Sequence, residues 1–216
     1  MALCAVLVAL AAPAAHAQAS ASASIASEYS QRGVSLSRGR PVAQLRVDYD
    51  APNGWYAGAF ASRAELAEGG VTAQVIAYGG YARRLPSGLT WEAGVLNASF
   101  MNSGEYRYHE FYAGLAHDRV SGRLYFSPAY YGGPKTMYAE LNSTLPLRER
   151  LTLIGHVGLL HGLDDRRGEA RNHLDLRLGL GLELGDCNVQ LAVLARTPGG
   201  RERNARALAL SASYAF

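Results

Sequence analysis

The stretch 172–184, NHLDLRLGLGLEL, carries the clearest structural signal in the sequence. Leucine occupies every second position from Leu174 to Leu184, with charged residues or glycine between the leucines and His173 before the first of them. In a β-strand this spacing puts all the leucines on one face, whereas in a helix it scatters them around the whole circumference. The stretch therefore predicts a strand with one apolar face and one polar or small face.

The same alternation recurs along nearly the whole chain and is interrupted by turns rich in Gly, Pro, Asn and Asp. It predicts about twelve strands, near 20–30, 40–50, 54–65, 71–83, 89–100, 106–117, 122–131, 135–145, 150–161, 171–184, 187–197 and 204–216. Every second connection is short, and the longest ones, 31–39 and 162–171, belong to the opposite side. Short turns on the side of the termini and longer loops on the other side are typical of bacterial outer-membrane barrels.

Composition excludes several classes of protein. With 216 residues, the chain fits one domain, and with 49% apolar and 18% charged residues it does not have the profile of a disordered protein. The net charge is +3 and the basic residues are scattered, so we expect no nucleic-acid partner. The two cysteines are Cys4 and Cys187, and we expect the first to be removed, so neither a disulfide nor a cysteine metal cluster is predicted.

The first seventeen residues read as a signal peptide. An apolar run over 3–12 is followed by Ala15-His16-Ala17, the small-residue pattern of a cleavage site, although a basic start is missing. The alternative is a buried N-terminal helix. Neither this run nor any other stretch has the roughly 18 to 20 apolar residues of a transmembrane helix. We therefore predict export, with residues 1–17 as the signal peptide and 18–216 as the mature domain.

Alternation alone does not separate a membrane barrel from a soluble sandwich or a periplasmic lipocalin-like binder. Most runs, however, reach the roughly 9 to 11 residues that a membrane-spanning strand needs. Aromatic residues also gather near strand ends, as in interfacial girdles. These aromatics are Tyr49, Trp55, Tyr56, Tyr81, Trp91, Phe100, Tyr106, Tyr130, Tyr131, Tyr214 and Phe216. The prediction is an all-β fold, a single antiparallel transmembrane β-barrel of about twelve strands, in the bacterial outer membrane.

The partners expected from this location are outer-membrane lipids and lipopolysaccharide. The last strand is amphipathic and ends on Phe216. Such an ending resembles the signal by which outer-membrane proteins are handed to the barrel assembly machinery, which we therefore expect as a further partner.

A family resemblance rests on the segment 27–37, SEYSQRGVSLS, followed by Asp48-Tyr49 and by 54–62, GWYAGAFAS. These residues resemble a proteobacterial family of uncharacterised exported proteins that carries a Gly-Cys-Trp label and opens with an S-D-Y-x-x-R-G-x-S-x-S pattern. Glu28 stands where that pattern has Asp. The match covers about the first third of the chain well and the rest mainly through strand pattern and the terminal Phe. The resemblance implies an outer-membrane barrel and no known activity.

The polar faces of the strands supply the candidate site. By parity the residues that line the lumen and could bind solutes are Arg46, Asp48, Glu92, Arg123, Glu140, His156, His173, Asp175, Arg177, Glu183 and Arg196. Glu110 also belongs to the lumen, because a charge facing lipid costs about 2 kcal/mol or more near the midplane. In the strand 54–65 either face could meet lipid. A barrel of this size is predicted to hold a narrow porin-like channel or a solute-binding lumen, and the alternative is a structural barrel plugged by ion pairs.

Catalysis is the rival function. Some outer-membrane barrels are lipid hydrolases or deacylases that use Ser and His, and both residue types are present here. No G-x-S-x-G elbow occurs and no Ser/His pair is apparent from spacing, so we expect no enzyme and name no catalytic residue. His173-x-Asp175 is too short a pattern for a metal site, and no cofactor is expected. Arg32-Gly33-Val34-Ser35 is left without a role beyond a turn with Gly33 at positive φ, and Cys187 is left without one.

Overall fold

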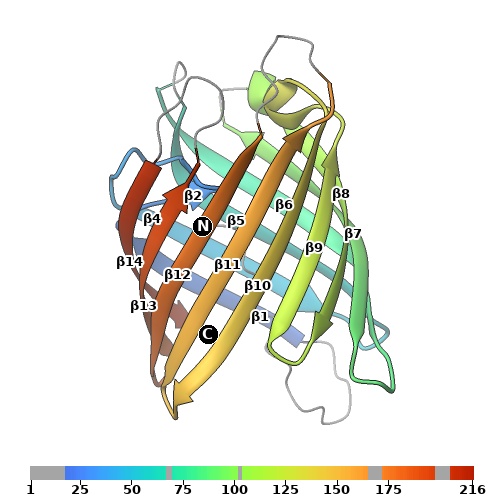
Figure 1. Cartoon of the computed structure of the whole chain (residues 1–216), viewed down its shortest axis with the longest axis vertical. Coiled ribbons are helices and arrows are strands. Elements are labelled where there is room, and N and C mark those ends of the chain that lie inside the picture. Colours follow the sequence, from blue (N-terminus) through green and yellow to red (C-terminus); the bar gives the residue numbers. More distant parts are fainter. Residues whose placement is uncertain (1–17, 67–69, 102–103, 165–171, 198–204) are drawn as a thin grey trace.

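The computed structural model describes residues 18–66, 70–101, 104–164, 172–197 and 205–216. Within these residues twelve strands close into one antiparallel barrel (Figure 1). The barrel strands are β1 (Gln18–Ala26), β4 (Val42–Asp50), β5 (Trp55–Leu66), β6 (Gly70–Arg84), β7 (Thr90–Phe100), β8 (Tyr108–His117), β9 (Val120–Ser127), β10 (Thr136–Arg148), β11 (Leu151–Gly162), β12 (His173–Leu184), β13 (Cys187–Arg196) and β14 (Ala205–Ala215). The predicted all-β barrel is confirmed. The expected signal peptide, residues 1–17, lies outside the described residues.

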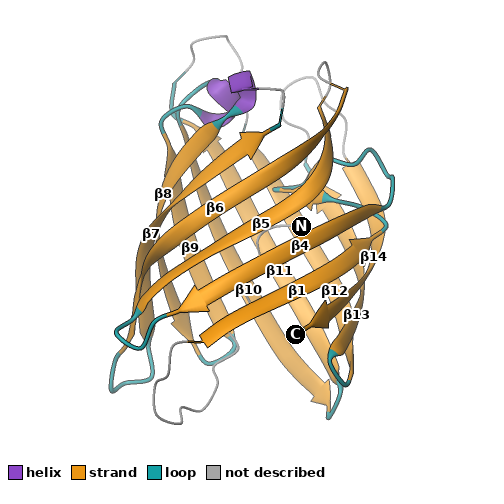
Figure 2. Ribbon diagram, turned by 180° about the vertical axis from the view of Figure 1, so that it is seen from behind, coloured by secondary structure: helices purple, strands orange, loops and turns teal. Residues whose placement is uncertain are grey.

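Each barrel strand pairs with its neighbours along the chain, and β1 closes the sheet by pairing with β14. The short turns 51–54, 85–89, 118–119, 149–150 and 185–186 share one end of the barrel with the described start of β1 and the end of β14 (Figure 1). The strands are tilted against the long axis of the molecule (Figure 2). Pairing of residues 22–26 of β1 with 211–215 of β14 closes the sheet, so backbone groups along this seam find partners that an open sheet edge would lack.

The apolar faces of the strands point outward. On β12, Leu178 is 60% exposed, whereas Asp175 on the other face is only 4% exposed. The strand whose facing the sequence left open, β5, places Trp55 outside and Phe60 inside. Leucines that point away from the interior are what a lipid-facing barrel requires. Among the described residues, no helix is both long and apolar enough to cross a membrane.

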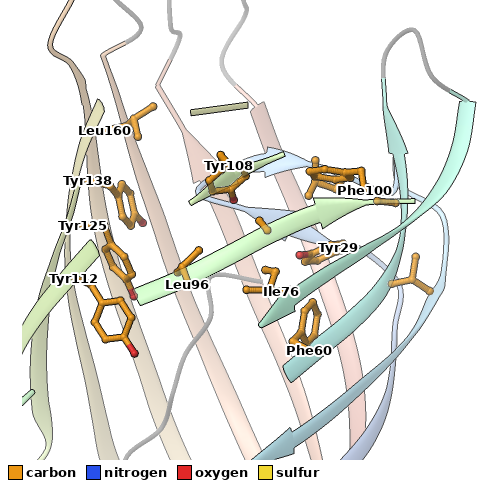
Figure 3. Close-up of a cluster of buried hydrophobic side chains, with 14 of the residues drawn as sticks. Tyr29, Phe60, Ile76, Leu96, Phe100, Tyr108, Tyr112, Tyr125, Tyr138 and Leu160 are labelled. Carbon is orange, nitrogen blue, oxygen red and sulfur yellow. The ribbon is translucent and has the colours of Figure 1, made fainter. Parts of the chain in front are cut away.

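The aromatic residues near strand ends divide into two groups, which corrects the expectation that all of them lie in interfacial girdles. Trp55, Tyr81 and Trp91 form a chain of ring contacts on the outside near the short turns, with centroids 5.4 and 5.6 Å apart. Other aromatics near strand ends instead pack in or against the cluster of buried side chains inside the barrel, of which Figure 3 shows the buried members, Phe100 among them. This second group is Tyr56, Phe100, Tyr106, Tyr130 and Tyr131.

The segment 27–41 between β1 and β4 folds into the barrel, which corrects the expectation of a long outer loop at 31–39. It carries a two-stranded hairpin of β2 (Ser30–Gln31) and β3 (Val34–Ser35). Tyr29, Arg32 and Leu36 are between 1% and 5% exposed. Alternation does not reveal this placement, because the burial comes from strands far away in the sequence. The lumen hairpin, as we call residues 27–41, is the part of the fold that builds the candidate site.

Candidate functional site in the barrel lumen

The turn of the lumen hairpin is a tight one. Arg32 and Gly33 connect β2 to β3 with φ angles of +49° and +73°, and positive φ at both central residues is what a type I′ turn requires. The expected positive φ of Gly33 is confirmed. A Cβ atom added to Gly33 would lie 2.8 Å from Cβ of Asp175 and 2.9 Å from Cδ of Arg196. The hairpin tip therefore packs directly against β12 and β13.

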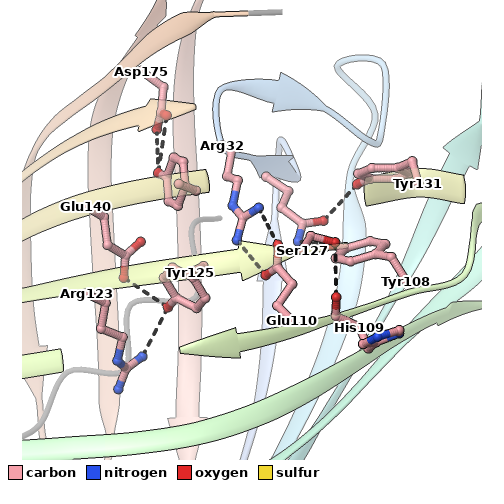
Figure 4. A network of polar contacts seen from close by, with 12 residues as sticks. Arg32, Tyr108, His109, Glu110, Arg123, Tyr125, Ser127, Tyr131, Glu140 and Asp175 are labelled. Atoms are coloured by element: carbon pink, nitrogen blue, oxygen red, sulfur yellow. Dashed lines mark hydrogen bonds and ion pairs between the residues drawn. The ribbon is translucent and has the colours of Figure 1, made fainter. Parts of the chain in front are cut away.

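A buried ion pair fastens the tip to the barrel wall. Arg32 donates through Nη1 to Oε1 of Glu110 at 2.7 Å and through Nη2 to Oε2 at 2.6 Å (Figure 4). The two side chains are 6% and 1% exposed. A bidentate pair of this kind fixes orientation as well as distance. It joins the hairpin to β8 across 78 residues of sequence.

Further hydrogen bonds connect the hairpin to opposite walls of the lumen. The Tyr29 hydroxyl donates to Oε1 of Gln74 on β6, and Nε2 of His173 on β12 lies 3.0 Å from the carbonyl oxygen of Arg32. In the strand order, β6 and β12 are six strands apart in either direction, so they are opposite walls of the barrel. Gln31 adds a bond from Nε2 to the Tyr108 hydroxyl at 2.8 Å. The hairpin thus forms a strut from wall to wall.

Tyrosine rings surround the Arg32 guanidinium. Its Cζ atom lies 4.2 Å from the ring centroid of Tyr138 and 5.1 Å from the centroids of Tyr125 and Tyr130. A cation over aromatic faces is stabilised by the ring quadrupole, more so where water is excluded. Tyr130 belongs to the short helix η2 (Tyr130–Gly132) in the β9–β10 connection. Burial raises the pKa of Tyr130 to about 12, so the ring stays neutral at physiological pH.

A second network links the walls from β5 to β10. Arg123 binds Glu92, with Nη2 and Oε2 3.0 Å apart, and the Tyr56 hydroxyl donates to the same oxygen at 2.9 Å. Tyr125 stands beside Arg123 and donates to Oε1 of Glu140 at 3.2 Å (Figure 4). These contacts fill that side of the lumen with paired charges and aromatic rings.

A third network centres on a buried histidine. Nε2 of His156 lies 2.9 Å from Oδ1 of Asp175, and Nδ1 lies 2.7 Å from Oδ1 of Asn142. The Tyr138 hydroxyl is 3.2 Å from Nε2 of the same ring and donates to Asp175. On β4, Nε of Arg46 donates to Oδ2 of Asp48 at 2.7 Å. Charges in the lumen are therefore largely arranged in pairs.

Small residues line the remaining sector of the lumen. The inward faces of β1 and β14 carry serine and alanine, and a cavity of about 30 Å³ lies between them and the hairpin. This cavity is lined by Ala26, Glu28, Ser30, Gly33, His156, Asp175, Leu176, Arg177, Leu194, Ala209 and Ser211. Its size suits one or two water-sized groups. Space in the lumen is therefore found beside the hairpin, along β12 to β14 and β1.

The model of a family described as bacterial protein of unknown function (Gcw_chp) matches residues 10–195, which is most of the chain. The protein belongs to the Gcw_chp family. The uncharacterised family expected from the N-terminal residues is thus confirmed, while the search of curated proteins found no significant match.

Solved structures resemble this Gcw_chp protein in fold. The KdgM porin superposes with a TM-score of 0.59, at 12% identity, over 91% of this chain and 99% of the porin chain. The NanC porin, in a rhombohedral crystal form, gives a TM-score of 0.60 at 12% identity with the same two coverages. At this identity the likeness shows the fold, a twelve-stranded barrel shared with porins.

The structure of the Gcw_chp protein separates the eleven predicted site residues by position. Buried inside the barrel are Glu92, Glu140, His156, His173 and Asp175, and partly buried are Arg46, Asp48, Arg123, Arg177 and Arg196. Glu183 is exposed near the end of β12 that carries the short turn. Two networks bring together Glu92 with Arg123 and His156 with Asp175. That these residues line a path for solutes stays a prediction.

Sequence reasoning missed the central residue of the site, Arg32. It placed Glu110 in the lumen correctly, since this side chain is 1% exposed, but named no partner for it. A signal was present, because Glu110 alternates with Tyr108 and Tyr112 on a face with no basic residue in β8. A carboxylate buried among tyrosines needs a cation from elsewhere in the chain. The sequence does not say which arginine supplies it.

Proposed function

We propose that this protein is a bacterial outer-membrane channel through which small hydrophilic solutes diffuse. The outward leucines suit a lipid environment, the fold is that of porins, and the lumen is polar. The proposal includes export by the signal peptide, contact with lipid and lipopolysaccharide on the outer face, and insertion by the barrel assembly machinery. Polar residues inside and apolar residues outside are the arrangement that a water-filled path through a bilayer requires.

The observation that carries the proposal is the asymmetry of the lumen. The hairpin, which reaches from β6 to β12, and the paired charges of β5 to β10 fill most of the lumen. The inward faces of β14 and β1 present small residues such as Ala209 and Ser211 beside a small cavity. In a barrel whose lumen is fully plugged, we would expect larger side chains to fill this sector as well. We infer that solutes pass between this wall and the hairpin.

A channel also accounts for His156 better than a lipid hydrolase does. The described partners of His156 are an aspartate, an asparagine and a tyrosine, and none of these is a serine nucleophile. A hydrolytic Ser requires a base within hydrogen-bond reach. We therefore propose passive transport without catalysis.

Single-channel recording in planar bilayers tests the proposal. The purified protein is expected to give small stepwise conductances, and Ser211→Trp is expected to lower the step by about half or more, since the indole fills the open sector of a tightly packed lumen. The matched control is Leu210→Trp, whose side chain points outward and is 53% exposed. Absence of conductance steps from correctly inserted protein would overturn the proposal in favour of a plugged structural barrel.

A further inference from the structure

Two arginines converge on one carboxylate oxygen at the loop end of the barrel. Nη1 of Arg40, near the end of the lumen hairpin, and Nη2 of Arg63, on β5, each donate to Oε1 of Glu65 at 3.2 Å. The Glu65 side chain is 7% exposed, whereas those of Arg40 and Arg63 are 64% and 46% exposed. Because two positive charges share one negative charge, positive charge remains in excess on the exposed side of this cluster.

The Arg63 side chain belongs to the outer face of the barrel. It lies eight positions after Trp55 on β5, and an even spacing puts both side chains on the same face. Trp55 is 59% exposed, whereas Phe60 on the other face is 6% exposed. The backbone N–H of Glu65 donates to the carbonyl oxygen of Leu36, so the lumen hairpin runs beside this end of β5.

The height of Arg63 matches the headgroup level of the outer leaflet. Eight strand residues rise about 26 Å along the strand and, at a tilt of about 40°, about 20 Å along the membrane normal. The ring contacts of Trp55, Tyr81 and Trp91 mark one boundary of the apolar band, which is typically about 25 Å tall in such barrels. A long arginine side chain spans the remaining distance, so its guanidinium reaches the opposite boundary.

The outer face at this level is mainly basic around the barrel. In the loop-side half of the described strands, the charged residues and histidines with outward parity are Arg63, Glu65, His109, His161 and Arg206. Glu65 is the one acid in this set, and both arginines of the cluster already contact it. Anionic groups at headgroup level are therefore attracted to this face.

We propose that Arg40 and Arg63 form a binding site for a phosphate group of an outer-leaflet lipid, namely the lipid A part of lipopolysaccharide. This inference rests on the outer-membrane location in the proposed function and assigns residues to the contact with lipopolysaccharide. Each guanidinium has five N–H donors, and the described hydrogen bonds use one of them, so several remain for phosphate oxygens. Glu65 holds the two guanidiniums side by side before the lipid arrives, which lowers the ordering cost of binding.

Native mass spectrometry of the protein in detergent micelles with added lipid A tests the site. The wild type is expected to bind lipid A with two phosphates about tenfold more tightly than dephosphorylated lipid A with the same acyl chains. The double variant Arg40→Gln, Arg63→Gln is expected to raise the half-saturating concentration of the phosphorylated lipid about tenfold, as for lost charge-assisted bonds at a partly screened site. The matched control is Arg83→Gln, Arg84→Gln, which removes two exposed arginines at the short-turn end of β6 and is expected to bind like the wild type.

Several outcomes would overturn the lipid site. These are equal binding of the two lipids, a double variant that binds like the wild type, and displacement of lipid A by inorganic phosphate at an equal concentration, which would indicate a site for soluble anions. Heat-modifiable migration on gels checks that each variant is folded. If the double variant does not fold, the comparison of the two lipids on the wild-type protein still decides.

Conductance in planar bilayers separates this inference from the proposed function. A protein that conducts without preferring the phosphorylated lipid would overturn the lipid site and leave the channel standing. A protein that prefers the phosphorylated lipid but never conducts would support the lipid site and overturn the channel.

Discussion

Arg32 is the residue whose loss we expect to destabilise the barrel interior most. Its guanidinium is the partner of Glu110, and both groups are withdrawn from water. Breaking a buried ion pair by removing one member typically costs about 3 to 5 kcal/mol, because the other charge is left uncompensated. We expect Arg32→Ala to lower the free energy of unfolding by about this amount, measured by urea titration in lipid vesicles with tryptophan fluorescence.

The double variant Arg32→Met, Glu110→Leu distinguishes charge from packing. Replacing both members of a buried pair by apolar residues of similar volume is often close to neutral, so this variant should recover most of the lost stability. Arg63→Ala removes an arginine whose side chain is 46% exposed, and it serves as the control with little expected change. If Arg32→Ala unfolded at the same urea concentration as the wild type, the ion pair would have no structural role.

At the scale of one strand, the outward leucines of β12 allow the membrane environment to be tested. Leu178 lies in the middle of the strand and Leu184 at its end, and both point outward, at 60% and 50% exposure. In a bilayer, an arginine on the lipid face costs about 2 to 4 kcal/mol at the midplane and about 0 to 1 near the interface. We expect Leu178→Arg to destabilise the barrel by the larger amount and Leu184→Arg by the smaller, in the same vesicle titration.

The two arginine variants of β12 also test whether the outer face of the barrel lies in lipid or in water. Both leucines are outside the barrel and neither touches the lumen networks, so their difference reports the depth at which each lies. A soluble barrel has no such depth, and equal costs for the two arginines would show that β12 does not face lipid.

The same strand and the hairpin mark the limit of sequence reasoning. The alternation from Leu174 to Leu184 predicts a strand and its apolar face, because the side-chain period of a strand is local. In the structure residues 173–182 pair with β11 and 175–184 with β13. The hairpin around Arg32 has no such period, and its position depends on Glu110, which is 78 residues away. Tyr130 was expected at the membrane interface for a related reason, since aromatic residues at strand ends suit either a girdle or the mouth of a lumen. In both cases, contacts with residues distant in the sequence determine where the side chain lies.

For the whole molecule, the barrel and the hairpin are separable. Ala26 at the end of β1 pairs directly with Val42 at the start of β4, so a short Asn-Gly turn can replace residues 27–41 without stretching the sheet. The twelve-strand ladder closes without any strand of the hairpin. Glu110→Gln must accompany the replacement, because the carboxylate would otherwise stay buried without Arg32.

We expect this shortened protein to insert and to conduct more than the wild type, because the strut from β6 to β12 no longer fills the lumen. Heat-modifiable migration of the detergent-extracted protein on gels checks that the barrel has formed, and Glu110→Gln in the full-length chain controls for the lost charge. A folded, shortened barrel with unchanged conductance would mean that the hairpin does not obstruct the path, and that the constriction lies in the barrel wall.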